Sequence, residues 1–291
     1  MDLDKYIADE MLKYKGVCFP VKSSMLKRLI TKKVKCSSLH PNPVDEFCDP
    51  KVGPSYRIIS EYEKKYIDGT KHLYGDQDEK DDPIIIEKMY PEGYIIVNGH
   101  HRWAASMRLR RPKIAVRIVN LTHEDDIKKM LENSNHDKRI TLDLDEIVFG
   151  QEGQDPLEKR LPFPLNLEYK ERLRSGIPAL FNHISKYGYD IWVYSSNCYY
   201  SMDYLKQLFK RYHVKVDGVV TGLGNNSKEE RSRIDKLIAD KYHTTIHVDR
   251  SLVLITNTGS KDFEEKEIGS DNANWSLKVM MIIDEIAKKE K

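Results

Sequence analysis

The segment 94–106 reads YIIVNGHHRWAAS and changes from a strand pattern to a helix pattern at its centre. The backbone N–H groups in the first turn of a helix have no partner within the helix and lie at the positive end of its dipole, so they attract anions. An arginine in that turn adds a guanidinium that can hold phosphate through two parallel hydrogen bonds. This junction is therefore predicted to bind phosphate through Asn98, Gly99, His100, His101 and Arg102.

A second set of reactive groups follows an apolar run in ITLDLDEIVF, residues 140–149. The run predicts a strand, and Asp143 and Asp145 stand near its carboxyl end, where open parallel sheets bind their ligands. One aspartate can attack a phosphoryl group, while the other protonates the leaving group and later activates water. Mg²⁺ would neutralise the crowded oxygens. The pattern indicates metal-assisted phosphoryl chemistry.

The composition limits the classes of partner. The 291 residues include 48 lysines and arginines against 46 aspartates and glutamates, a net charge of +2, so no global field favours nucleic acid. No apolar run is long enough for a membrane span, and the first residues resemble an amphipathic helix rather than a secretory signal. The four cysteines form no CxxC pair, which fits reduced thiols. We expect a cytoplasmic protein without a membrane partner and with nucleic acid as an unlikely one.

The chain is predicted to contain two domains that carry these two sites. In residues 1–134, four segments have strand composition and three have helical patterns, one of them starting at Thr122 as its cap. The segment 68–82 is the most polar loop. The expected strands are 34–39, 83–90, 93–99 and 113–120, and the expected helices are 54–67, a segment opening at His100, and 122–133.

Residues 135–291 alternate strands and helices in the rhythm of a Rossmann-like parallel sheet, so the fold class is α/β. The strands are expected at 140–149, 190–196, 217–222 and 244–251, with 252–257 as a fifth, and the helices at 167–187, 201–212, 227–242 and 274–289.

From about Val34 to Asn120 the chain resembles the ParB/sulfiredoxin fold, with SSLHPNPVDEF in the place of that fold's first motif. This implies an α+β nucleotide-binding domain. His100 stands where sulfiredoxins carry their reactive cysteine, and no helix-turn-helix of the partition proteins follows. The GHHR form is similar to the free serine kinases of this fold. That resemblance implies ATP or ADP as the donor, phosphates held by Gly99 to Arg102, and Glu46 as the base, with Asp45 as the alternative.

Residues 138 to about 288 resemble the haloacid dehalogenase superfamily, whose motifs occur here in the right order. Asp143 and Asp145 match its first motif, and the matches to its other motifs are Ser195, Lys228 and Asp249. The resemblance implies Mg²⁺ held by Asp143, Asp145 and Asp249, with Ser195 and Lys228 on the phosphate. Little room remains for a large cap. Arg250 stands where the family usually has a second acid near Asp249.

Together these features predict a phosphoryl-transfer enzyme with two sites. The first domain would be a nucleotide-dependent kinase of a small hydroxyl substrate, with free serine the best candidate, and the second a magnesium-dependent phosphohydrolase. The alternative is a nucleotide-sensing regulatory protein whose second domain is degenerate and serves for interaction. The partners would be a nucleotide and a small hydroxyl-bearing or phosphorylated molecule. Oligomeric state and the acceptor remain open at this level.

Overall fold

The chain divides into two compact units, Met1–Leu121 and Thr122–Lys291, each described separately below. Sequence analysis places the boundary at 134/135 instead. Thr122 accounts for the difference, because its N–H donates to the Thr221 carbonyl at 3.0 Å and its hydroxyl accepts from the Thr221 N–H at 2.9 Å. These bonds anchor the following helix in the second unit. The computed structural model describes residues 2–14, 19–28, 30–68, 83–196, 200–260, 262–269 and 274–289.

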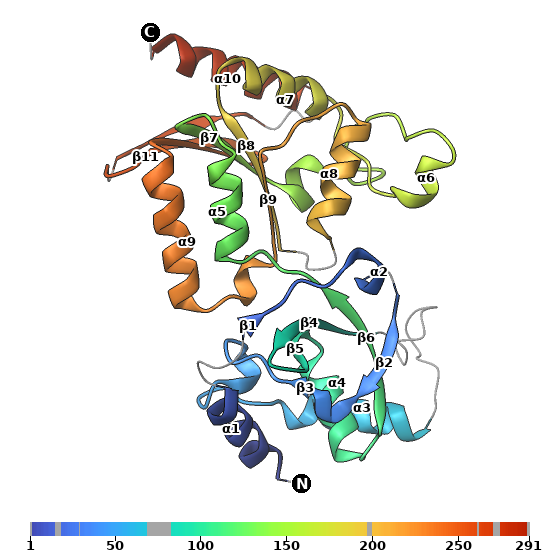
Figure 1. The fold of residues 1–291 in the computed structure, drawn as a ribbon. Helices are drawn as coiled ribbons and strands as arrows, with labels where there is room; N and C mark the ends of the chain where they lie inside the picture. The colour runs from blue at the N-terminus through green and yellow to red at the C-terminus, as the bar shows by residue number, and fades with distance from the viewer. Residues whose placement is uncertain are drawn as a thin grey trace. The chain divides into compact units, whose positions relative to one another are not determined.

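The first unit is built on a mixed sheet of order β2-β6-β4-β5-β3, with β1 paired to the end of β4 (Figure 1). Its inner face carries buried Ile84, Ile86 and Ile96, which pack with Trp103 in one apolar core. Period-two burial along β6 follows the alternation of a half-covered strand. The strands are β1 (Phe19–Pro20), β2 (Lys32–Lys35), β3 (Leu39–His40), β4 (Ile84–Tyr90), β5 (Tyr94–Asn98) and β6 (Lys113–Val119).

The helices of the first unit include α4, which begins at His100 directly after β5, as predicted. Gly99 precedes it with φ +102°, a left-handed conformation that favours glycine. The indole of Trp103 donates to the Cys36 carbonyl at 3.1 Å and fixes the helix on the sheet. The predicted loop 68–82 lies outside the described residues from Gly69 onward. The helices are α1 (Leu3–Tyr14), α2 (Met25–Arg28), α3 (Tyr56–Asp68) and α4 (His100–Arg108).

The second unit contains a sheet of order β12-β11-β10-β7-β8-β9, in which β10, β7, β8 and β9 are parallel (Figure 1). This confirms the α/β class. The predicted fifth strand forms β11, but it pairs antiparallel with β10 through a tight connection, and β12 extends the sheet antiparallel again. The strands are β7 (Lys138–Asp143), β8 (Asp190–Ser195), β9 (Gly218–Thr221), β10 (Thr244–Val248), β11 (Leu252–Asn257) and β12 (Phe263–Glu267).

Helices cover the two faces of this sheet, with α5 and α9 on one side and α7 and α10 on the other (Figure 1). The cap of α5 is His123 rather than the predicted Thr122, and its N–H donates to Asp126 at 2.9 Å. Within the described part of the chain, no helix is both long and apolar enough to cross a membrane. The helices are α5 (Glu124–Glu132), α6 (Leu165–Glu168), α7 (Ile177–Lys186), α8 (Met202–Arg211), α9 (Lys228–Lys241) and α10 (Trp275–Lys289).

Two expected elements of the second unit are wrong in extent. The strand predicted over 140–149 ends at Asp143, and Leu144–Val148 form a π-helical turn whose buried Leu144, Ile147 and Val148 keep the run apolar. The helix predicted over 167–187 is divided, because Leu173 and Arg174 form isolated β-bridges and Gly176 has φ +84°. Both corrections place polar side chains near the carboxyl edge of the sheet.

Close packing against β8 predicts that Gly218 tolerates no side chain. It lies opposite Trp192, and a Cβ there would be 2.3 Å from the indole ring. Gly218→Ala should therefore destabilise the protein by ~1–3 kcal/mol, the usual cost of overpacking. Gly224→Ala is the matched control, since a Cβ there would meet no heavy atom within 4 Å. Urea denaturation of both variants tests this, and equal midpoints would contradict the packing argument.

Candidate functional sites

A cavity of about 290 Å³ opens at the start of α4, close to the ~300 Å³ at which ligand pockets begin. It brings the junction between β5 and α4 together with the turn that follows β3. The first turn of α4 supplies backbone N–H groups at its wall. The lining residues are Asp45, Ile58, Tyr62, Val97, Asn98, Gly99, His100, His101 and Arg102.

His100 is buried at this cavity and carries no charge. Its Nε2 accepts a hydrogen bond from the Asn42 N–H at 3.1 Å, which leaves the ring proton on Nδ1. Nδ1 lies 3.5 Å from the Asp45 carboxylate. Burial lowers the pKa of His100 to about 4, while Asp45 opposes the shift and His101 adds to it. His100 therefore fixes the preceding loop and presents its proton to Asp45.

His101 has a similar arrangement. Its Nε2 accepts from the Ser55 N–H at 3.1 Å, and burial lowers its pKa although Asp45 acts in the opposite direction. The Phe47 ring stacks on His100 at 5.3 Å and meets the edge of His101 at 5.2 Å. The two histidines thus hold the loop 42–55 against α4. They supply neutral rings to the site rather than the cationic donors that a row of basic residues suggests.

Arg102 provides the positive charge of this site. It is buried, and its Nη2 donates to the Asn98 side-chain oxygen at 3.3 Å. A Cβ at Gly99 would lie 2.9 Å from the same Nη2, so glycine is needed for space as well as for its backbone conformation. A buried guanidinium at a helix N-terminus is suited to bind a phosphate through charge-assisted hydrogen bonds.

The two acidic residues proposed as base occupy different environments. Glu46 is exposed in a short 3₁₀ turn and does not line the cavity. Asp45 lines it, accepts the Phe47 N–H at 2.9 Å through Oδ1, and directs Oδ2 toward His100. The geometry favours Asp45, the alternative in the sequence analysis, over Glu46.

In the second unit, the π-helical turn after β7 separates the two aspartates of the DxD motif. Asp143 ends the strand and lines a cavity of about 510 Å³ between α9 and the sheet, together with Asp249. Asp145 lies inside the turn and lines another cavity, of about 470 Å³. The sequence spacing of two residues therefore does not bring both carboxylates into one cavity.

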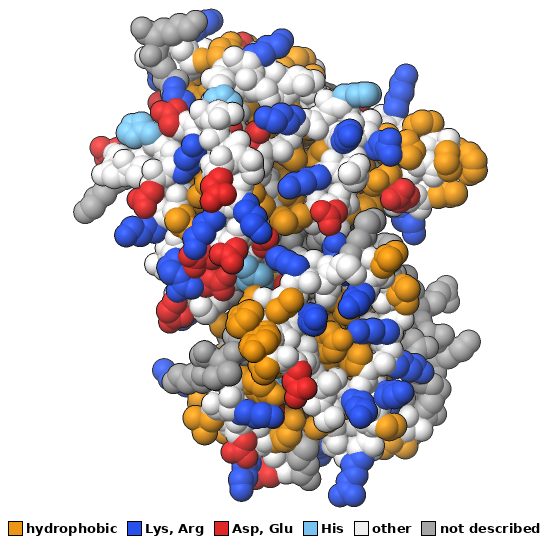
Figure 2. Space-filling view, viewed as in Figure 1, with side chains coloured by type: hydrophobic (Ala, Val, Ile, Leu, Met, Phe, Trp, Pro, Cys, Tyr) orange, Lys and Arg blue, Asp and Glu red, His pale blue; other side chains and the backbone are white. Residues whose placement is uncertain are grey.

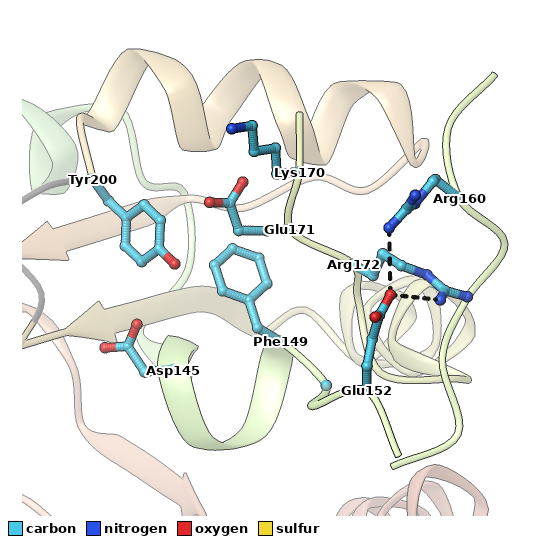
Figure 3. Close-up of a pocket in the computed structure, with 9 residues that line it drawn as sticks. Asp145, Phe149, Glu152, Arg160, Lys170, Glu171, Arg172 and Tyr200 are labelled. Carbon is cyan, nitrogen blue, oxygen red and sulfur yellow. Dashed lines mark hydrogen bonds and ion pairs between the residues drawn. The ribbon is translucent and has the colours of Figure 1, made fainter. Parts of the chain in front are cut away.

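Of the two aspartates, Asp145 is the one that is hydrogen-bonded to another predicted site residue. Its Oδ2 accepts a hydrogen bond from the Ser195 hydroxyl at 2.7 Å, which brings together two of the predicted site residues. In Figure 3, Asp145 and Tyr200 face one end of the cavity, and Arg160 and Arg172 bind Glu152 at the other. Burial, with Glu171 and Asp145 nearby, raises the pKa of Tyr200 to about 12. The phenol therefore stays protonated at neutral pH and can donate a hydrogen bond.

The remaining predicted residues are less closely gathered. Lys228 is exposed at the start of α9 and lines neither cavity, and Asp249 is exposed directly after β10. Arg250 donates through Nε to the Glu146 carbonyl at 3.1 Å and lies 3.7 Å from Asp155. It therefore supports the π-helical turn.

The described residues contain no group of three or more histidine, cysteine, aspartate or glutamate side chains that could hold a metal ion. Asp143, Asp145 and Asp249 thus do not assemble a three-carboxylate magnesium site. Mg²⁺ often retains several waters and takes one or two carboxylates plus substrate phosphates. Magnesium that arrives with a nucleotide remains a proposal for this protein.

Several residues around Asp145 were missed by sequence reasoning. They lie in the loops on either side of the short helix α6, between the π-helical turn and α7, where no periodic pattern draws attention. The high density of charged residues in EKRLPFPLNLEYKER was the one available signal. The missed residues are Glu152, Arg160, Lys170, Glu171 and Arg172.

A known family matches a segment of the chain that includes part of the first site. Residues 74–135 match the ParB N-terminal domain family, a segment that contains Asn98 to Arg102 and omits Asp45 and nearly all of the second unit. No curated protein matches the chain. The chain therefore contains a ParB-like segment that carries the predicted phosphate-binding junction.

The uncharged state of His100 predicts that the stability of the first unit depends on pH. The unfolded chain protonates this ring below about 6.5, whereas the folded protein resists protonation until about 4. The contribution of the neutral His100 ring to the free energy of unfolding is fully present above pH 6.5. It declines by ~3 kcal/mol as the pH falls toward 4. His100→Gln should flatten the pH dependence of urea unfolding in this range. The exposed control His243→Gln should leave it unchanged, and equal slopes in all three proteins would contradict the assignment.

Proposed function

We propose that the first unit is a nucleotide-dependent kinase of a small hydroxyl substrate. One observation carries the proposal: Asp45 and the buried Arg102 line the same cavity at the N-terminus of α4. An anion site for donor phosphates and a carboxylate for the acceptor proton are the two protein groups that phosphoryl transfer requires most. The ParB-like segment supports a nucleotide as donor.

The reaction can be written from these groups. The acceptor hydroxyl attacks the terminal phosphorus of ATP or ADP, its proton passes to the Asp45 carboxylate, and the bond to the bridging oxygen of the leaving nucleotide breaks. The Nδ1–H group of His100 faces Asp45, with its nitrogen 3.5 Å from the carboxylate, and orients it. Arg102 and the first-turn N–H groups bind the phosphoryl oxygens as charge develops. Free serine is the acceptor that the GHHR resemblance favours.

Phosphorus NMR of the protein with Mg²⁺, ATP or ADP, and free hydroxyl amino acids tests this proposal. Asp45→Asn preserves the shape of the side chain and can still accept the Phe47 N–H, but it removes the base, so formation of the phosphomonoester should fall ~100-fold or more. Nucleotide affinity should change little. Glu46→Gln is the matched control and should retain the rate.

Loss of activity in Glu46→Gln, with Asp45→Asn active, would reverse the assignment of the base. Nucleotide binding without product from any acceptor would favour the alternative, a nucleotide-sensing protein. The bond between Arg250 and Glu146 supports that alternative for the second unit.

For the second unit we propose phosphohydrolase chemistry of the haloacid dehalogenase type. The Ser195–Asp145 hydrogen bond at the edge where β7 and β8 end supports it, because it holds an acid–base carboxylate beside a small hydroxyl. The Asp143 carboxylate would attack the phosphorus while the bond from phosphorus to the leaving oxygen breaks and Asp145 protonates that oxygen. Asp145 would then take a proton from a water molecule that attacks the aspartyl-phosphate, which releases inorganic phosphate and restores Asp143. The two cavities require that a substrate phosphate reach the sheet edge between them.

Release of inorganic phosphate from a panel of phosphomonoesters tests this second activity. Asp143→Asn should abolish release, and Asp145→Asn should lower it ~100-fold or more, since general acid–base catalysis contributes this much. Asp240→Asn, an exposed carboxylate on α9, is the control and should retain activity. Phosphate release that survives Asp143→Asn would exclude this mechanism.

A further inference from the structure

Although the net charge of the protein is nearly balanced, basic and acidic residues are unevenly distributed along the first unit. No aspartate or glutamate occurs from Met11 to Val44, or from Gly93 to Leu121, while both runs are rich in lysine and arginine. The acidic residues of this unit lie before and between these runs. The elements built from these two runs therefore contribute basic side chains and no acidic ones.

The fold pairs the two runs directly. β2 and β6 are antiparallel neighbours, with Lys33 opposite Ala115 and Lys35 opposite Lys113. The alternate residues of β6, Ile114, Val116 and Ile118, are buried, so Lys113 and Arg117 project from the outer side of the sheet. Helix α2 contacts β6 and adds an exposed lysine. The β2–β6 basic face consists of Lys27, Lys33, Lys35, Lys113 and Arg117.

Figure 2 shows lysine and arginine side chains gathered over the region that α2, β2 and β6 occupy in Figure 1. Lysines on an exposed edge strand such as β2 also discourage edge-to-edge aggregation. That role does not account for Lys113 and Arg117, because β6 lies between β2 and β4. A pair of like charges directly opposite each other, as at Lys35 and Lys113, destabilises a sheet. The arrangement costs stability unless an anion covers it.

We propose that the β2–β6 basic face binds the phosphate backbone of a nucleic acid. The cations are spread along two strands and a helix instead of converging on one point, which suits a polymer with regularly spaced charges better than a single phosphate. Alternate residues of a strand lie roughly 6.6 Å apart on one face, and duplex DNA carries a charge per about 1.7 Å of its axis. The proposal is independent of the kinase assignment.

Two features show how this face relates to the family match and why nucleic acid suits it better than a lipid surface. Lys27, Lys33 and Lys35 lie before the matched segment 74–135, whereas Lys113 and Arg117 lie inside it, so the family match covers only part of the face. A membrane-surface helix needs an extended apolar side, whereas α2 spans four residues, with Leu26 as its exposed apolar side chain among those described. The rigid strand pair therefore favours nucleic acid over a lipid surface.

Fluorescence anisotropy of the full chain with a labelled DNA duplex, and with single-stranded DNA and RNA, tests the proposal across a salt series. If all five cations contact phosphates, the logarithm of the duplex affinity should fall with the logarithm of salt with a slope of about −4.5. The double variant Lys33→Glu and Lys35→Glu should make the slope shallower by about two and weaken binding ~10-fold or more at about 50 mM salt.

A matched pair, Lys51→Glu and Lys64→Glu, changes the net charge equally at exposed positions of the same unit and should keep the affinity. Lys35→Glu alone should not lower thermal stability, because it converts a like-charge pair with Lys113 into an opposite-charge one. Equal loss of binding in both double variants would overturn the proposal. So would binding to anionic lipid vesicles without binding to any nucleic acid, or no binding at all.

Discussion

The backbone conformation of Gly99 is the constraint on which the first site depends. Its φ of +102° ends β5 and starts α4 within one residue, and the missing side chain leaves room for the Arg102 guanidinium to fold back against it. The helix start then directs His100 and His101 toward the loop 42–55, where each accepts one backbone N–H. Through these bonds Asp45 comes to line the cavity. A local turn thus places the proposed anion site and a carboxylate side by side.

In the second unit, a π-helical turn rather than a glycine positions the polar side chains. The π-helical turn after β7 moves Asp145 off the strand and within 2.7 Å of the Ser195 hydroxyl on the neighbouring strand. Arg250 donates to the Glu146 carbonyl of that turn and so helps to hold it. Arg250 is the residue that departs from the haloacid dehalogenase pattern. In the structure its side chain supports the π-helical turn.

Sequence patterns predicted most strands and helices because burial imposes their periods, and the helix start at His100 followed from Gly99. They predicted extents poorly where apolar spacing fits two structures, as in 140–149, whose π-helical turn remains apolar while it departs from the strand. The choice between Asp45 and Glu46 needed three dimensions, since adjacent residues share the same motif but only Asp45 lines the cavity. Likewise, the spacing of Asp143 and Asp145 could not show that a turn places them in separate cavities.

Net charge is a limited guide to partners, because it averages over surfaces that a partner meets separately. The first unit carries positive charge at two places, which differ in their burial. Arg102 is buried, so its attraction for a phosphate is little screened by salt and acts on a single compact anion. The β2–β6 basic face is exposed, so each of its charges is weak alone and gains affinity only by displacing counterions along a polymer. Burial therefore decides which kind of phosphate each cluster is suited to bind, and residue counts carry no information about burial.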